Sequence, residues 1–293
     1  MLVLFILVGC VADPNPTLLV CLEVKSAPFS SNSGPNHGLD YDVAALVAEA
    51  LQRPLAVHWF SASTEEELPA PLQANWLLSR GSCHLIGGYP LARDGLGDAP
   101  MAELRASDPD HPSLSVRLNT LAASQPYMSL PLTLISAASG RPVTRLDDVL
   151  GLRLAVERES LADAIATAYA GTRRQHRIQR LPFADDAIFR ALETGAADFA
   201  LVEQHRFEIY RSRVPNTRLQ ETGYRHVLAV NTGFAGIAPA LLQEVDGALQ
   251  KLMARGDVAA IVEAHGLSYT APGKPAILPP ITPRLLARRE EGH

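Results

Sequence analysis

Short apolar runs alternate with segments of helical periodicity in two successive series along this chain of 293 residues. In the first series, runs at residues 18–24, 55–60 and 83–86 are separated by helix-like stretches that begin near residues 40 and 68. Strands separated by a helix usually pair in parallel, because the helix returns the chain to the same edge of the sheet. The pattern therefore predicts an open α/β sheet with helices on its faces.

The second series repeats this alternation, and its apolar runs lie at residues 130–136, 152–156, 176–181, 199–202 and 226–231. The first and last of these runs flank the others. They predict two strands that carry the chain out of the first sheet and back into it. Two lobes then face each other across a cleft, and such a cleft is a natural ligand site.

These patterns divide the chain into a leader with a tether at 1–16, lobe 1 at 17–131 plus 227–271, and lobe 2 at 132–226. Residues 272–293 are proline-rich and then charged, so we expect a tail that is disordered or laid on the surface. Residues 91–115 are rich in Asp, Pro, Ala and Gly with weak periodicity, which indicates a surface insertion that serves as a lid or partner loop.

Charge and composition argue against nucleic-acid binding, against binding to an anionic membrane surface and against a membrane-spanning protein. The net charge of -5 and the pI of about 6.0 provide no basic surface for nucleic acid or for an anionic membrane. No apolar run after the first ten residues approaches the ~20 residues needed to cross a bilayer. We therefore expect a mature protein that is soluble or merely tethered.

The first ten residues are almost uninterruptedly apolar and end in Leu-Val-Gly-Cys, which looks like the lipobox of bacterial lipoproteins. This interpretation makes Cys10 the lipidated first residue of the mature chain. It would place the protein in the periplasm or on the outer face of the cell membrane, held only by lipid. Secretion without lipid and a buried N-terminal strand are the alternatives, because no Lys or Arg precedes the apolar stretch.

Cys21 and Cys83 remain as an even pair in an exported chain, which favours one disulfide. Cys21 lies in the first expected strand and Cys83 begins the third, and these strands are commonly neighbours in an open α/β sheet. Two buried free thiols are the alternative.

Four segments follow one another in an order typical of one family. They are residues 27–30 with 38–43 (Ala-Pro-Phe-Ser and Gly-Leu-Asp-Tyr-Asp-Val), 117–127 (Arg-Leu-Asn-Thr-Leu-Ala-Ala-Ser-Gln-Pro-Tyr), 146–160 and 191–203. Over nearly the whole chain they resemble the family 3 bacterial extracellular solute-binding proteins, the periplasmic polar amino acid-binding type. The resemblance implies the type II periplasmic-binding-protein fold and a monomeric receptor. That receptor would deliver a small polar, amino acid-like ligand to the permease of an ABC importer.

A narrower resemblance offers an alternative. Cys21, Cys83 and the turn at residues 88–90 (Gly-Tyr-Pro) resemble the branch of this fold that is associated with quinoprotein (PQQ) alcohol dehydrogenases. That branch implies an envelope accessory protein. A third possibility is an enzyme on the same fold, but the sequence has no acid and base at a defined spacing, so we expect no catalysis.

The resemblance assigns the two charged ligand contacts. Arg117 falls where the family grips the ligand carboxylate, a task that suits the two parallel donors of a guanidinium. Glu203 falls at the family's acidic position for the ligand amino group. The alternatives are a surface arginine and an acid that stabilises the start of a helix.

Ser160 begins the first helix of lobe 2, where free amides suit an anion, although Glu159 replaces the family's glycine beside it. Capping of that helix is the other role for Ser160. Phe29, Tyr127 and Tyr41 are candidate aromatic walls of the cleft, with core packing as the alternative.

No metal or cofactor is expected. The nine histidines show no ligand spacing for a metal, and the sequence contains no Gly-x-Ser-x-Gly, phosphate-binding glycine loop or His-Glu-x-x-His motif.

Overall fold

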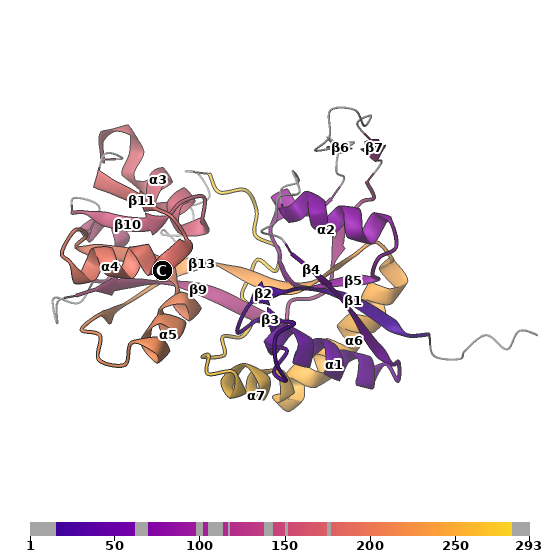
Figure 1. Cartoon of the computed structure of the whole chain (residues 1–293). Helices are drawn as coiled ribbons and strands as arrows, with labels where there is room; N and C mark the ends of the chain where they lie inside the picture. Colours follow the sequence, from indigo (N-terminus) through magenta and orange to yellow (C-terminus); the bar gives the residue numbers. More distant parts are fainter. Residues whose placement is uncertain are drawn as a thin grey trace, which may run out of the picture.

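The computed structural model describes residues 16–61, 70–97, 102–104, 114–116, 118–137, 143–149, 152–174 and 177–282. These residues form two α/β lobes joined by two long strands, as Figure 1 shows. None of the helices in the described ranges is long and apolar enough to span a membrane.

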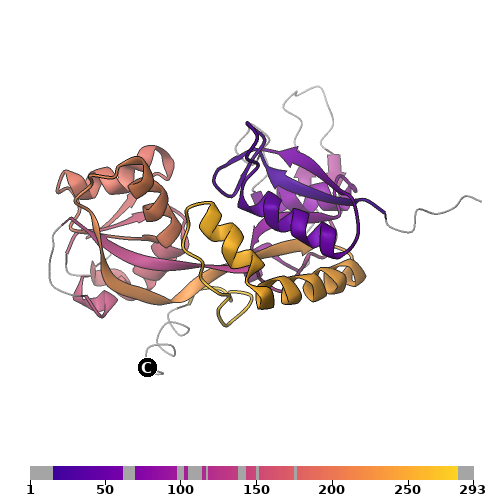
Figure 2. The same ribbon diagram turned by 90° about the horizontal axis from the view of Figure 1, so that it is seen from below.

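Two antiparallel strands, β9 (Met128–Ser136) and β13 (Gln220–Gly236), connect the lobes. Figure 2 shows them continuing from one lobe into the other. They are central in a sheet of nine described strands with the order β11-β10-β12-β9-β13-β5-β1-β4, and a short β8 (Ala122–Ala123) pairs with β13. Each lobe therefore has its own parallel strands on one side of a shared pair.

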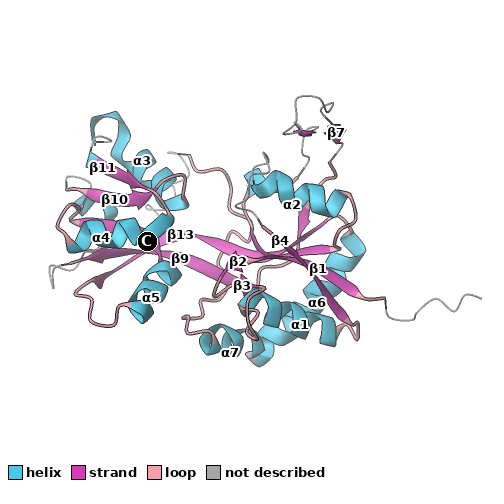
Figure 3. Cartoon of the chain, in the orientation of Figure 1, coloured by secondary structure: helices cyan, strands magenta, loops and turns pink. Residues whose placement is uncertain are grey.

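Lobe 1 is built from β1 (Leu18–Glu23), β4 (Leu55–Phe60) and β5 (Leu85–Pro90), with a small β2–β3 hairpin (Lys25–Ser26 and Ser30–Ser31). Its helices are α1 (Leu39–Ala50), α2 (Ala70–Ser79), α6 (Pro239–Arg255) and α7 (Asp257–Ala264). Figure 3 shows α2 on one face of the sheet and the other three helices on the opposite face. The apolar residues of α1 pack against β1 through Leu39, Val43 and Val47, which are completely buried.

Lobe 2 contains β10 (Leu154–Glu157), β11 (Ile178–Leu181) and β12 (Phe199–Glu203), with helices α3 (Leu161–Arg174), α4 (Ala187–Glu193) and α5 (Gln204–Arg213). Strand β10 pairs in parallel with both neighbours, whereas β12 meets β9 in antiparallel register. Parallel strands place their carboxyl ends at one edge of the sheet, where ligand contacts are usual.

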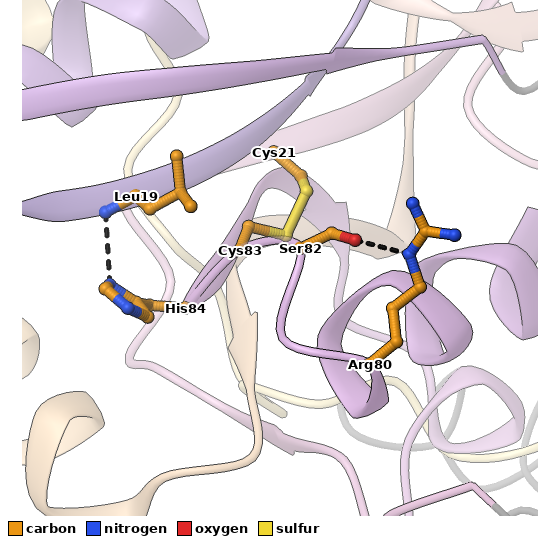
Figure 4. The surroundings of a disulfide bond; sticks show 6 residues. All are labelled: Leu19, Cys21, Arg80, Ser82, Cys83 and His84. Carbon is orange, nitrogen blue, oxygen red and sulfur yellow. Dashed lines mark hydrogen bonds between the residues drawn. A yellow bond between two sulfur atoms is a disulfide. The ribbon is translucent and has the colours of Figure 1, made fainter.

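A disulfide joins Cys21 and Cys83, with a Cα to Cα distance of 5.7 Å, so the predicted pairing is confirmed. Strands β1 and β5 are parallel neighbours, as expected, although β5 begins at Leu85, after Cys83. Figure 4 shows the sulfur bridge beside a second link, in which the Leu19 amide donates to His84 Nδ1 at 3.1 Å.

The insertion expected at residues 91–115 is described only in part. Within it, β6 (Ala102–Leu104) pairs antiparallel with β7 (Leu114–Val116), and Figure 1 shows this hairpin projecting beyond α2. The leader with Cys10, Arg117 and residues 283–293 lie outside the described residues.

The described part of the tail contacts both lobes. The Leu278 amide donates to the Leu91 carbonyl at 2.8 Å, and the Leu278 carbonyl accepts from the Arg93 amide at 2.9 Å. The Leu278 side chain is 5% exposed and belongs to the core of lobe 2. Asn231 of β13 holds the same segment through hydrogen bonds to three backbone carbonyls, those of Gly273, Pro275 and Ala276.

Candidate functional site

A cavity of about 520 Å³ lies at the carboxyl ends of the lobe 1 strands. Glu23 at the end of β1, Phe60 at the end of β4 and the last residues of β5 form part of its wall. Leu130 of β9 and Thr232 of β13 also line it. The cavity therefore lies where the parallel strands of lobe 1 meet the two strands that lead to lobe 2.

The loop that carries Phe29 is fixed to the start of α1. The amide of Leu39 donates to the Pro28 carbonyl at 3.0 Å, and the amide of Asp40 donates to the Phe29 carbonyl at 2.8 Å. Gly38 has a φ of 94°, and a Cβ there would collide with the Phe29 carbonyl. This local sequence places the Phe29 side chain and the Asp40 carboxyl on the same cavity wall.

Asp40 and Tyr127 form a buried hydrogen-bonded pair behind the cavity. The Tyr127 hydroxyl donates to Asp40 Oδ1 at 2.6 Å and accepts from the Gly88 amide at 3.1 Å. Burial raises the pKa of Asp40 to about 7, the hydrogen bond from Tyr127 lowers it, and the nearby charge of Glu23 raises it further. The cavity floor thus contains a carboxyl group that titrates near neutral pH.

The charged side chains that line the cavity are all acidic, namely Glu23, Asp40 and Asp94. Burial also raises the pKa of Glu23 above its ordinary value. The remaining wall is largely apolar, and its bulky members are Phe29, Phe60, Ile86, Tyr89 and Leu130. Such a cavity suits a ligand with an apolar body and a group that carboxylates attract.

Lobe 2 has a second acidic edge at the carboxyl ends of its strands. Glu157 ends β10, and its carboxylate accepts a hydrogen bond from Arg206 Nη2 at 2.7 Å. Glu203 ends β12 directly before α5. Burial, followed by the charge of Glu157, raises the pKa of Glu203 to about 7, and Arg206 acts in the opposite direction.

Phe29 and His205 connect the two lobes at the cavity. Their rings meet edge to face, with centroids 4.9 Å apart. His205 follows Glu203 by two residues, so this contact joins the start of α5 to the cavity wall through Phe29, although Glu157 and Glu203 themselves do not line the cavity. Burial and the charge of Arg206 lower the pKa of His205 to about 3, which keeps its ring neutral.

The other residues singled out from the sequence lie in different places. Tyr127 is completely buried behind the cavity wall. Tyr41 lies parallel to Trp59, with centroids 6.5 Å apart, and neither ring lines the cavity. Ser160 caps α3, because its hydroxyl accepts from the Asp163 amide at 3.1 Å.

The Asp163 carboxylate accepts hydrogen bonds at the start of α3, where the sequence predicts an anion site. Its Oδ2 accepts a hydrogen bond from the Glu159 amide at 3.2 Å, and its Oδ1 accepts one from Arg180 Nε at 2.8 Å. The Ser160 amide donates to the Glu157 carbonyl at 3.3 Å. The amides of Glu159, Ser160 and Asp163 beside the expected anion site are therefore already bonded.

Sequence reasoning did not select Glu23, Asp40, Glu157, His205 or Arg206. A usable signal existed for the acids at strand ends, because carboxyl ends of parallel strands are where ligand contacts gather. No local pattern identifies the pair of Glu157 and Arg206, since 49 residues separate its members.

No family model matches the chain, and no curated protein matches it. Solved structures share its fold. The L-cystine solute receptor of Neisseria gonorrhoeae in its unliganded open conformation has 17% identity and a TM-score of 0.61, covering 86% of this chain and 94% of the receptor. The GluR0 ligand-binding core in complex with L-glutamate has 17% identity and a TM-score of 0.59, covering 85% and 98%.

Substrate-binding domain 2 of Lactococcus lactis GlnP in its open conformation has 14% identity and a TM-score of 0.58, covering 87% of this chain and 97% of that domain. These similarities show that the chain has the type II periplasmic-binding-protein fold, as the sequence predicts.

Proposed function

We propose that this protein is an extracytoplasmic solute-binding protein that captures a small, amino acid-like polar ligand and is not an enzyme. The observation that carries the proposal is the cavity of about 520 Å³ at the carboxyl ends of the lobe 1 strands. Its wall includes both connecting strands and contacts lobe 2 through Phe29 and His205. A ligand there would touch the parts that set the relative position of the lobes.

Ligand capture would act through movement of the lobes about β9 and β13. Strand β13 has register shifts between Glu221 and Arg225 and between Arg225 and Ala229, on the side that pairs with β9. Such irregularities interrupt the ladder and suit a bending point. Closure on a ligand would change the surface that the two lobes present together, and the permease of an ABC importer would recognise that closed form.

The proposed location outside the cytoplasm is supported by the disulfide between Cys21 and Cys83, because disulfides persist in oxidising compartments. Lipidation of Cys10 would tether the receptor near its permease, and the receptor would act as a monomer.

An accessory role in a quinoprotein alcohol dehydrogenase system is the second candidate. It is favoured by the position of the disulfide, which secures the segment leading into Gly88, Tyr89 and Pro90 of the cavity wall. These three residues are the end of β5 rather than a turn, and Tyr89 donates from there to the Gly95 carbonyl at 2.6 Å. A partner dehydrogenase, rather than a permease, would then recognise the protein.

Thermal melting against amino acids, amines, small carboxylates, sugars and alcohols tests the proposed function. A ligand that binds only the native state should raise the unfolding free energy by about 2.7 kcal/mol at a concentration of 100 times its Kd. Isothermal titration then measures the affinity. If no compound in the whole panel shifts the melting midpoint or produces binding heat, solute capture is contradicted and the accessory role is favoured.

A further inference from the structure

The cavity contains a buried polar group that needs a partner. Thr232 is 4% exposed and lines the cavity, and its hydroxyl lies near that of Tyr127 without the geometry of a hydrogen bond. Among the described residues, Thr232 Oγ1 has no hydrogen-bond partner. Buried polar groups are nearly always bonded, so a polar group of a ligand is expected beside it.

The charge around this position favours a cation. Glu23, Asp40 and Asp94 line the cavity, and the described lining residues include no Lys or Arg. A ligand carboxylate would be repelled by these acids, whereas an ammonium group would be attracted. The Phe29 ring adds a face on which a cation can rest.

Lobe 2 reinforces this preference. Among the described residues, Glu203 takes part in no ion pair. The nearby Arg206 is bonded elsewhere through Nη2, which donates to Glu157 at 2.7 Å and to the Phe183 carbonyl at 3.1 Å, while its buried Nε has no hydrogen-bond partner among the described residues. Its guanidinium also lies 3.8 Å from the centre of the Phe183 ring. Within the described ranges, Glu203 is thus influenced by the charge of Arg206 but forms no ion pair with it.

The start of α3 does not complete a carboxylate site. Asp163 accepts the Glu159 amide, Ser160 accepts the Asp163 amide, and the Ser160 amide is bonded to the Glu157 carbonyl. The Asp163 carboxylate at this place is paired with Arg180 Nε at 2.8 Å, and Glu159 adds a second carboxylate beside it. An incoming carboxylate would have to displace one carboxylate and approach another.

Resting on the proposed solute-binding function, we propose that the ligand is a small organic amine with an apolar body and without the carboxylate of an amino acid. Its ammonium group would be held between the acids of lobe 1 and Glu203 of lobe 2. Its body would lie against Phe29, Phe60 and Ile86. Closure of the lobes would place the acids of lobe 1 and Glu203 of lobe 2 around one ammonium group. Without a ligand, repulsion between these acids would hold the lobes apart.

Matched ligands test this inference directly. Phenethylamine with phenylalanine, and 3-methylbutylamine with leucine, differ only in the carboxylate, while 3-phenylpropionate and 2-phenylethanol remove the positive charge. Isothermal titration should show at least tenfold tighter binding of an amine than of its amino acid. The acid and the alcohol should bind more weakly than phenethylamine.

Glu203→Gln should weaken amine binding about tenfold or more without loss of folding, because glutamine keeps the size of the side chain and removes its ability to carry a negative charge. Glu49→Gln is the matched control, since Glu49 is exposed at the end of α1 and does not line the cavity. Unchanged amine affinity in Glu203→Gln would overturn the inference.

Tighter binding of an amino acid than of its amine, lost on Arg117→Ala, would also overturn the inference and leave the proposed function intact. Absence of binding by every compound in the wider panel would contradict the proposed function itself.

Discussion

The Tyr127 hydroxyl donates a 2.6 Å hydrogen bond to Asp40 Oδ1 and thereby joins the start of α1 to the beginning of β9. The same hydroxyl accepts from the Gly88 amide in β5. One phenol therefore ties three segments of lobe 1 together directly behind the cavity. The shape of the cavity floor depends on this arrangement, and so does the protonation of its central acid.

Asp40→Asn should change how stability depends on pH. In the native state the pKa of Asp40 is about 7, and in the unfolded chain it is about 3.9. Between these values the folded state holds the proton and the unfolded state does not. The unfolding free energy of the wild type therefore falls as pH rises from about 4 to about 7, by on the order of 4 kcal/mol from this group.

Urea unfolding of wild type and Asp40→Asn at pH 4.5 and pH 8 measures this effect. The asparagine variant should gain stability relative to wild type on going from the lower to the higher pH. Contributions from Glu203 and His205 are present in both proteins and cancel in the difference. A difference that does not vary with pH would mean that Asp40 is ionised throughout.

Gly88→Ala should disturb the cavity far more than Gly34→Ala. Both glycines have positive φ, 64° and 77°, so both variants bear the same type of backbone strain. A Cβ at Gly88 would collide with the Asp40 carboxyl, whereas a Cβ at Gly34 meets nothing within 4 Å. We expect Gly88→Ala to lower the melting midpoint by several degrees more and to reduce ligand affinity at least tenfold. Equal midpoints and affinities would show that Asp40 moves aside freely.

Removal of the disulfide by Cys21→Ala with Cys83→Ala should lower the unfolding free energy by about 2 to 4 kcal/mol. The bridge closes a loop of 62 residues, so its loss enlarges the unfolded ensemble. Chemical unfolding with and without reductant measures the change. The double variant should be insensitive to reductant, and two titratable thiols at positions 21 and 83 in the unfolded wild type would contradict the bridge.

Periodicity located the strands and most helices, but some elements depend on contacts that a local pattern does not contain. The run at 226–231 predicts a short strand, whereas β13 extends over Gln220–Gly236. Its first half carries Glu221 and Arg225, which form an ion pair at 2.7 Å and have no apolar alternation. Pairing with β9 holds this segment extended despite its polar sequence.

Helix α5 was not predicted because its apolar residues are sparse. Phe207 and Tyr210 are the buried aromatic residues of α5, Ile209 is its one other apolar residue, and the remaining seven side chains are charged or polar. Tertiary contacts, such as the stacking of Phe189 on Tyr210 at 4.4 Å, stabilise this helix from outside its own sequence.

The candidate site could be predicted only in outline. The place of Phe29 on the cavity wall could be predicted because it depends on the local backbone around Gly38. Such local backbone features can be recognised in a sequence. The acidic character of the cavity arises from strand ends that converge in space, and sequence spacing does not reveal convergence. The hydrogen bond that Asp163 accepts at the start of α3 likewise depends on the direction of its side chain, which sequence spacing does not reveal.

Cys10→Ala should release the exported protein from membranes. The lipobox interpretation makes the Cys10 thiol the acceptor of the lipid, and no helix in the described ranges can replace that anchor. Fractionation of cells expressing wild type and variant, with metabolic labelling by a palmitate analogue, gives the measurement. Label should be confined to the wild type, and a variant that still sediments with membranes would count against lipidation.

Leu278→Ala should destabilise the protein by about 2 to 4 kcal/mol, the usual cost of emptying a buried leucine site. Leu278 is 5% exposed in the core of lobe 2, while its backbone is bonded to Leu91 and Arg93 at the end of lobe 1. Leu152→Ala is the matched control, because Leu152 is 42% exposed and its truncation should cost less than about 1 kcal/mol. Urea unfolding measures both variants.

Since the tail segment contacts both lobes, its loosening should also alter their relative movement, so Leu278→Ala should change the rate of ligand dissociation measured by stopped-flow fluorescence. Equal stability of the two variants would show that the tail adds nothing to the fold, and an unchanged dissociation rate would show that it does not restrain the lobes.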